Sequence, residues 1–262
     1  MPIVRVNNRQ ISYWEGKHKQ QAGRETILFV HGAGGGQLTW SLQKGFFERY
    51  THPIVIELPG HGESGGEGEQ EIGRYAEHVH SFMRTLSLPK SFLVGHSMGG
   101  AIVQTLALRH PEVVKGIVLV GTGARLRVLP AILEGIKSNF KETVSMITRY
   151  AFSRKAPQEL IEKGIQQLMG VRPEVLYGDF LACDHFNTME EVENIDPPTL
   201  IICGEEDELT PVKYSQYLHS RIKGARLEVL PKAGHMVMME SAETFNARVK
   251  AFVENSVFSR NQ

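Results

Sequence analysis

Several features that would point to particular functions are scarce in this 262-residue chain. It has two cysteines, Cys183 and Cys203, which are too few for a disulfide framework, and no Cys/His spacing typical of structural zinc. Its 29 basic and 29 acidic residues cancel, which removes the electrostatic argument for nucleic acid as a partner. No apolar run approaches the ~18 residues that span a bilayer. Residues 1–6 lack the basic start and apolar stretch of a signal peptide. We therefore expect a cytoplasmic protein with no metal and no stable membrane insertion.

Short β-rich runs alternate with helical stretches, which predicts a mostly parallel sheet with helices on its faces. Residues 2–6 and 10–15 alternate between apolar and polar, and we expect them to form an antiparallel pair at one edge. The spacing of apolar residues predicts helices, and Thr210 is expected to cap the third of them. The expected buried strands are 26–30, 53–57, 91–94, 116–120, 199–203 and 226–230, and the expected helices are 72–86, 101–109, 212–222 and 242–253.

The strand pattern stops between about Arg125 and Glu191, after the expected strand 116–120, and resumes at Pro198. Four helical pieces replace it, near 128–138, 140–152, 157–169 and 173–186. We therefore predict a core formed by residues 1–124 and 191–262, and a helical cap, or lid, formed by residues 125–190.

A candidate nucleophile lies where an expected strand meets an expected helix. The run 91–94 leads directly into Gly95-His96-Ser97-Met98-Gly99-Gly100, so a G-x-S-x-G motif occupies the turn. Flanking glycines permit the strained backbone that lifts a serine hydroxyl above the end of a sheet. This context favours Ser97 as a nucleophile over a surface serine in a glycine-rich connection.

A serine hydroxyl is a weak nucleophile and needs a base, which in turn needs an orienting group. His235 is the best candidate base because its loop follows the last expected strand. The orienting acid is sought in the run Gly204-Glu205-Glu206-Asp207-Glu208, directly after another strand. Asp207 fits best, since it stays on the loop before the next helix begins, and Glu206 and Glu205 are the alternatives.

Backbone N–H groups that stabilise a developing oxyanion can also be named. One is the N–H of Met98, which follows the nucleophile, and the other is that of Ala33 in the glycine-rich loop 31–36. A dinucleotide cradle is the competing interpretation of such loops, but Gln37 and Leu126 stand where G-x-G-x-x-G would need its last glycine.

With these motifs the chain resembles the α/β-hydrolase superfamily, and in particular capped serine esterases, lipases and carbon–carbon hydrolases. The resemblance covers nearly the whole chain and rests on segments 31–36, 58–64, 95–100, 204–211 and 233–235, with Ser, Asp and His in that order. It implies an eight-stranded sheet with one antiparallel strand, a lid inserted after the sixth strand, and no cofactor. Glu57 departs from the aspartate of most relatives, at a position that looks structural.

The expected activity is hydrolysis of carboxylic esters with small or medium apolar acyl groups through an acyl-enzyme, as in carboxylesterases or monoacylglycerol lipases. The expected partner is a small-molecule ester, and a homodimer is left open. The alternatives are hydrolysis of a C–C bond in a diketone-like substrate, or a ligand receptor without turnover. Epoxide and haloalkane hydrolysis are disfavoured because they use a carboxylate nucleophile. The residues expected to line the substrate pocket are Phe140, Met146, Phe152, Met189 and Met236.

Overall fold

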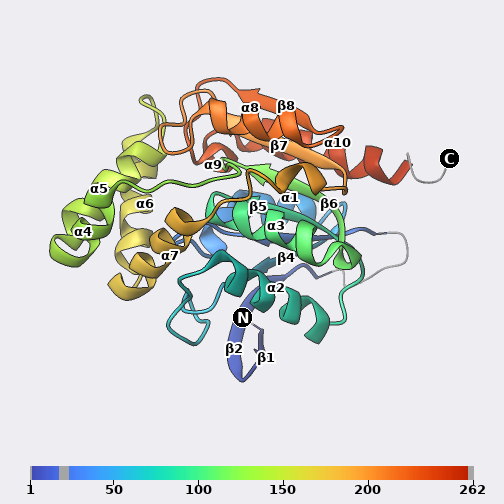
Figure 1. The fold of residues 1–262 in the computed structure, drawn as a ribbon, viewed down its shortest axis with the longest axis horizontal. Helices are drawn as coiled ribbons and strands as arrows, with labels where there is room; N and C mark the ends of the chain where they lie inside the picture. Colours follow the sequence, from blue (N-terminus) through green and yellow to red (C-terminus); the bar gives the residue numbers. More distant parts are fainter. Residues whose placement is uncertain (1, 18–23, 259–262) are drawn as a thin grey trace.

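The computed structural model describes residues 2–17 and 24–258, which build an eight-stranded sheet (Figure 1). The strand order is β1-β2-β4-β3-β5-β6-β7-β8. β2 runs antiparallel to its neighbours β1 and β4, and the other neighbouring pairs are parallel. The strands are β1 (Ile3–Val6), β2 (Arg9–Glu15), β3 (Thr26–Val30), β4 (His52–Ile56), β5 (Ser91–His96), β6 (Val114–Val120), β7 (Thr199–Gly204) and β8 (Arg226–Leu230).

The predicted fold class is confirmed, including the antiparallel pair at the edge and the single antiparallel strand. The sequence pattern is clear because the central strands are buried on both faces. Along β3, Leu28 and Val30 pack into one apolar cluster, and Ile27 and Phe29 pack into the cluster on the opposite face. Each such side chain contributes about 1.5–3 kcal/mol when fully buried, so these two clusters dominate the stability of the core.

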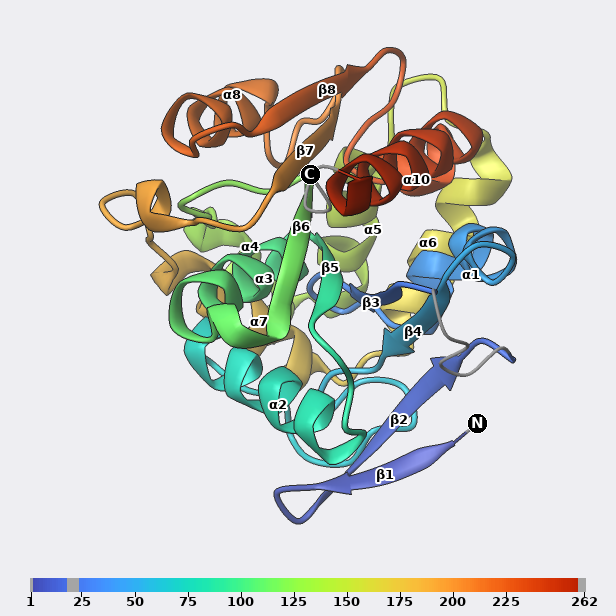
Figure 2. The ribbon, with the colours of Figure 1, turned by 90° about the vertical axis from the view of Figure 1, so that its right-hand side faces the viewer.

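Helices cover both faces of the sheet (Figure 2). Helices α2, α3 and α8 pack on one face, and α1 and α10 pack on the other. The four predicted helices are present, whereas the short helices α1 and α9 were not anticipated. The helices of this part are α1 (Ser41–Phe47), α2 (Ile72–Thr85), α3 (Met98–Arg109), α8 (Val212–Arg221), α9 (Val237–Glu240) and α10 (Ala242–Phe258), with short 3₁₀ turns η1 (Gln37–Trp40), η2 (Pro111–Val113) and η3 (Val192–Asn194).

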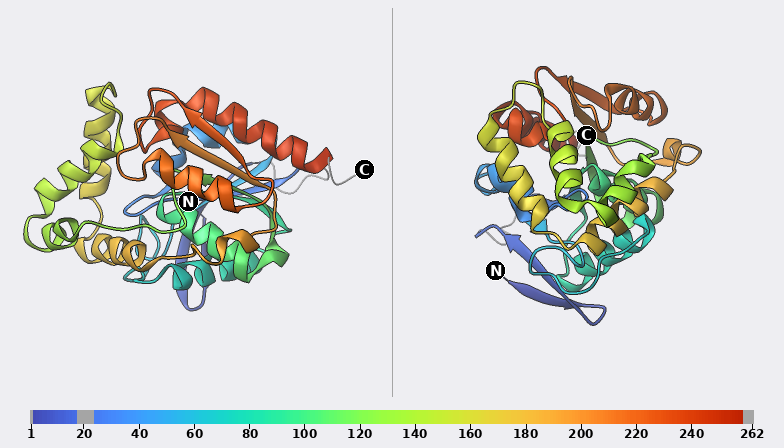
Figure 3. Two further views of the ribbon diagram at one scale, coloured as in Figure 1. Left: turned by 45° about the horizontal axis from the view of Figure 1, so that its top comes forward. Right: turned by 90° about the vertical axis from the view of Figure 1, so that its left-hand side faces the viewer.

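The chain between β6 and β7 forms four helices at one end of the molecule (Figure 3). They are α4 (Pro130–Ser138), α5 (Phe140–Ala151), α6 (Gln158–Met169) and α7 (Pro173–His185), and they share a small apolar cluster centred on Ile136, Val144 and Leu176. The segment leaves and returns at one neck, where Arg125 forms an isolated antiparallel bridge with Asn187. Thr188 N–H also donates to Ala124 O at 2.7 Å. These contacts hold the two ends of the inserted segment together just after β6.

Both cysteines are free and buried, and burial raises the pKa of each thiol. Neither is therefore poised as a thiolate nucleophile. Within residues 2–17 and 24–258, every helix is too short or too polar to cross a bilayer.

Candidate active site

Ser97 occupies the sharp turn between β5 and α3. Its backbone has φ 53° and ψ −115°, a conformation that is rare for a residue with a side chain. The two motif glycines permit this turn: a Cβ on Gly95 would collide with Gly99 O, and one on Gly99 would collide with Val30 O. The turn leaves the Ser97 side chain partly exposed at the end of the sheet, as the sequence motif predicts.

His235 and Asp207 form a buried pair on the loops after β8 and β7. His235 Nδ1 lies 2.9 Å from Asp207 Oδ2, and both side chains are almost fully buried. Asp207 Oδ1 accepts the N–H groups of Leu209 at 2.9 Å and of Thr210 at 2.8 Å. Burial opposes ionisation of Asp207, but the charge and hydrogen bond of His235, together with the bonds from Thr210, lower its pKa. Asp207 is thus held as a carboxylate that fixes Nδ1 of His235 as the donor.

The alternative acids lie elsewhere. Glu205 is exposed and accepts the N–H of Lys232 at 3.4 Å, and Glu206 accepts the N–H of Arg154 at 3.3 Å. Within the run 205–208, Asp207 is the buried carboxylate.

Thr210 belongs to this cluster, contrary to the role expected from the sequence. Its Oγ1 donates to Asp207 Oδ2 at 2.8 Å and lies 3.1 Å from His235 Nδ1. It does not cap α8, which begins at Val212 after Pro211 and has no side-chain cap. The Thr210 hydroxyl donates to the Asp207 carboxylate and is not available to cap the helix. The Thr-Pro pattern that suggests a helix start therefore marks a residue of the site.

His96 and Glu240 hold the backbone around His235. His96 Nε2 donates to His235 O at 3.1 Å, and burial followed by the nearby His235 charge lowers the pKa of His96 to about 3. Glu240 accepts the N–H of Gly234 at 2.9 Å with one oxygen and that of Ser153, at the end of α5, at 2.9 Å with the other. Glu240 was not predicted from the sequence. Its position at the end of the short helix that follows the His235 loop is the one feature that could have suggested this role.

The two expected oxyanion donors are backbone N–H groups with no hydrogen-bond acceptor in the described part of the chain. Met98 is the first residue of α3, where an N–H has no partner within its own helix. Around Ala33, the neighbouring amides are used: Gly34 N–H donates to Asp179 Oδ2 at 2.8 Å, and Gly35 N–H donates to Gly32 O at 3.0 Å. The N–H groups of Ala33 and Met98 thus remain available for a ligand.

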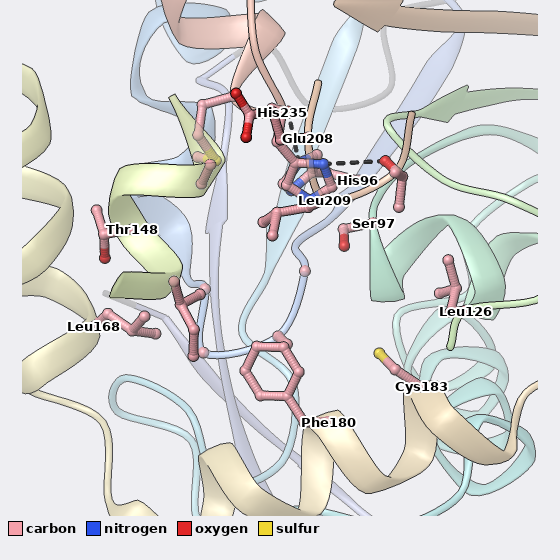
Figure 4. Close-up of a pocket in the computed structure, with 18 of the residues that line it drawn as sticks. His96, Ser97, Leu126, Thr148, Leu168, Phe180, Cys183, Glu208, Leu209 and His235 are labelled. Carbon is pink, nitrogen blue, oxygen red and sulfur yellow. Dashed lines mark hydrogen bonds between the residues drawn. The ribbon is translucent and has the colours of Figure 1, made fainter. Parts of the chain in front are cut away.

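A cavity of about 410 Å³ lies between Ala33, Ser97 and His235 and the inserted helices. Figure 4 shows Ser97 and His235 on one side of it and Phe180 and Cys183 of α7 on the other. Its apolar lining includes Leu126, Val128, Leu129, Ile132, Ile147, Phe152, Leu168, Phe180 and Met236.

Two of the five expected pocket residues, Phe152 and Met236, line this cavity, and three do not. Phe140 packs in the apolar cluster among the inserted helices. Met146 is 38% exposed, because the buried face of α5 is formed by residues three and four apart that leave it on the outer face. Met189 lines a separate surface cavity with Tyr214 and Tyr217. These three residues therefore lie outside the cavity beside Ser97, contrary to expectation. Their placement depends on helix phase and on packing between helices, which the sequence does not reveal.

One group of three potential metal ligands in the described residues lies away from the cavity. Glu77, His80 and His110 place ligating atoms within 4.8 Å of one another on α2 and just after α3. None of the three lines the cavity beside Ser97.

Comparison with known proteins agrees with this geometry. Residues 25–242 match the alpha/beta hydrolase fold family, and the chain belongs to that family. A pimeloyl-acyl-carrier-protein methyl ester esterase of Neisseria meningitidis serogroup A is 30% identical over 220 residues, covering 78% of this chain and 69% of the relative.

Two further relatives match almost the full length. A 2-hydroxy-6-oxo-6-phenylhexa-2,4-dienoate hydrolase of Burkholderia cepacia is 28% identical, covering 97% of this chain and 96% of the relative. A solved structure described as a thermophilic esterase is 36% identical and superimposes with a TM-score of 0.85 over 97% of both chains. The family and these names support a hydrolase.

Proposed function

We propose that this chain is a serine hydrolase that cleaves carboxylic esters with small or medium apolar acyl groups. Ser97 is the nucleophile, His235 the general base and Asp207 the carboxylate that orients it. The observation that carries the proposal is the buried 2.9 Å pair of His235 and Asp207, which opens onto the same cavity as the strained Ser97 turn. A receptor without turnover has no need for an imidazole oriented in this way.

Acylation begins when Ser97 Oγ attacks the ester carbonyl carbon and its proton passes to Nε2 of His235. The carbonyl oxygen becomes an oxyanion and accepts the free N–H groups of Ala33 and Met98, which need no rearrangement during the reaction. The tetrahedral intermediate then expels the alkoxide, which takes the proton from His235 and leaves as an alcohol. The acyl group remains on Ser97.

Deacylation repeats these steps with water. His235 takes a proton from the water as its oxygen attacks the acyl carbon, and the same two N–H groups bind the new oxyanion. Collapse of the intermediate breaks the bond to Ser97 Oγ, which recovers the proton from His235. The carboxylic acid leaves, and the enzyme returns to its starting state.

We propose further that residues 125–190 act as a cap over a core of residues 1–124 and 191–262. This segment supplies most of the apolar side chains of the cavity, including Ile147, Leu168 and Phe180. Exclusion of water by these side chains strengthens the electrostatic interactions around the reacting carbonyl. A mainly apolar cavity of about 410 Å³ fits the acyl part of an ester of modest size.

Cleavage of a C–C bond is the second candidate. The cavity is lined by Arg127, Lys163 and Lys213 but by a single acid, Glu208, and this excess of cations suits a substrate with a carboxylate. The Burkholderia cepacia relative has such a substrate in its name. A dienoate of that class, tested beside the esters, distinguishes the two candidates by their relative kcat/KM.

Ser97→Ala tests the proposal directly, because it removes only the hydroxyl of a partly exposed side chain. We expect hydrolysis of p-nitrophenyl butyrate and labelling by a fluorophosphonate probe to disappear, while the circular dichroism spectrum is retained. Full activity of this variant would overturn the proposed function. Labelling of the wild-type protein would also separate an enzyme from a ligand receptor, since only an activated serine reacts.

A further inference from the structure

A second buried carboxylate, Asp179 of α7, lies beneath the loop that holds Ala33. Its side chain is fully buried. Asp179 Oδ2 accepts the Gly34 N–H at 2.8 Å and His61 Nε2–H at 2.7 Å, and Oδ1 accepts the hydroxyl of Tyr75 at 2.5 Å. A buried carboxylate needs such partners because its ionised form is otherwise strongly disfavoured. One side chain of the inserted segment thus joins three separate parts of the core.

The partners of His61 show that it carries a positive charge. Its Nδ1 lies 3.1 Å from Pro59 O and its Nε2 lies 2.7 Å from Asp179, so both nitrogens face acceptors and both must be protonated. Burial opposes this charge, but the Asp179 carboxylate raises the pKa of His61. The neighbouring His31 is neutral, since Nδ1 donates to Gly32 O and Nε2 accepts the N–H of Leu58. His61 and Asp179 therefore form a buried ion pair next to the loop.

Two further side chains of the inserted helices also pack against this loop. Gly34 has φ +61°, and a Cβ at that position would collide with the side chain of Leu168 and lie 2.7 Å from that of Leu176. Asp179 thus holds the peptide between Ala33 and Gly34 through the Gly34 N–H, and the two leucines fill the space beside the Gly34 α-carbon. If that peptide flipped, Ala33 O would replace the Gly34 N–H and face the Asp179 carboxylate, an arrangement that repulsion disfavours.

We propose that Asp179 is a positioning residue: by accepting the Gly34 N–H it fixes the loop around Ala33, and with it the preceding Gly32–Ala33 peptide, whose N–H binds the transition-state oxyanion. It acts through Gly34 and does not line the substrate cavity. This inference rests on the proposed function, because it requires an oxyanion at Ala33. It differs from a purely structural role, which would affect folding and leave the rate per folded site unchanged.

The experiment uses Asp179→Asn, which keeps the shape of the side chain and removes its charge. Endpoint titration with a fluorophosphonate counts the competent sites, so that kcat for p-nitrophenyl butyrate is expressed per site. We expect kcat to fall on the order of 10- to 100-fold, which is at or below the roughly 10²–10³-fold loss seen when an oxyanion donor is removed outright, because Asp179 acts on the donor indirectly. KM should change by less than about threefold, and the inhibition constant of a phenylboronic acid, which forms a tetrahedral adduct with serine, should rise as much as kcat falls.

Tyr75→Phe is the matched control, because it removes the partner of the other carboxylate oxygen and does not touch Gly34. We expect it to lower the melting temperature while kcat stays within about threefold of wild type. Equal losses of kcat in the two variants, or an Asp179→Asn variant with unchanged kcat, would overturn the proposal. Asp179→Ser is the second variant if Asp179→Asn does not fold, and failure of both to fold would assign Asp179 to stability alone. Retention of activity by Ser97→Ala would instead overturn the proposed function.

Discussion

Thr210 donates its hydroxyl hydrogen to the Asp207 oxygen, Oδ2, that also accepts from His235 Nδ1, at an O···O distance of 2.8 Å. The carboxylate therefore has every oxygen engaged: Oδ2 by these two side chains, and Oδ1 by the N–H groups of Leu209 and Thr210. Burial alone would raise the pKa of Asp207, but the charge of His235, together with the hydrogen bonds from His235 and Thr210, lowers it.

Thr210→Val tests the contribution of that hydroxyl, since it replaces the hydroxyl with a methyl group of similar size. A hydrogen bond to a charged group contributes about 1.5–3 kcal/mol, so we expect kcat to fall about tenfold and the protein to lose stability of the same order. Steady-state kinetics and urea unfolding measure both effects. Unchanged kcat would show that the backbone N–H groups alone hold Asp207.

Asp207→Asn should have a larger effect, because an amide cannot keep His235 in the tautomer with a proton on Nδ1. We expect kcat to fall about 10⁴-fold, as in the serine-protease triad, with the fold intact. Glu206→Gln is the control, because Glu206 accepts the N–H of Arg154 and does not contact His235. A nearly silent Asp207→Asn combined with a severe Glu206→Gln would show that the acid has been misassigned.

The sequence predicts the framework of this protein better than the contacts within the site. Strands, helices and the Ser97 turn follow from periodicity and glycine spacing, which are local signals. Asp179 was missed because its importance depends on partners at positions 34, 61 and 75, although it falls on the buried face of α7 with Val175, Ala182 and Cys183. A carboxylate on the apolar face of a helix is a signal that could have identified it.

Buried histidines predict a loss of stability in acid. The pKa of His31 is lowered to about 3 by burial and then by the charge of His61, and the pKa of His96 is lowered to about 3 by burial and then by His235. In the unfolded chain both titrate near 6.5, so between pH 6.5 and about 3 unfolding takes up protons. Stability therefore falls as the pH drops through this window, by about 2 kcal/mol per histidine at pH 5.

His61 and Asp207 change the pH dependence of stability at the two ends of the range between pH 6.5 and about 3. The raised pKa of His61 stabilises the fold below the unfolded value of 6.5, and this contribution is lost as the pH rises through its folded pKa. The lowered pKa of Asp207 stabilises the fold above 3.8 and is lost below it. Urea unfolding followed by tryptophan fluorescence at pH 7 and pH 5 measures the effect, and His96→Gln should reduce it by about half. Equal stability at the two pH values would contradict this prediction.

The cap residues that contact the cavity should determine the preferred acyl length. Phe152 and Leu168 both line the cavity, and Phe152 packs against α6 with its ring 3.0 Å from the Cβ position of Gly164. Replacing either with alanine opens space for a longer chain. We expect the ratio of kcat/KM for p-nitrophenyl octanoate to that for the butyrate to change by about 10- to 200-fold, which corresponds to ~1–3 kcal/mol per filled pocket.

Met146→Ala is the control for this series because Met146 belongs to the same helical segment but lies outside the cavity. It should leave the octanoate-to-butyrate ratio within about twofold of wild type. Truncation of a buried aromatic side chain destabilises a protein by about 3–5 kcal/mol, so rates are compared per site after fluorophosphonate titration and below the melting temperature. If Phe152→Ala and Leu168→Ala lower stability while the ratio stays at the wild-type value, these side chains support the cap without shaping the acyl pocket. Substrate selection would then depend on the core residues beside Ser97.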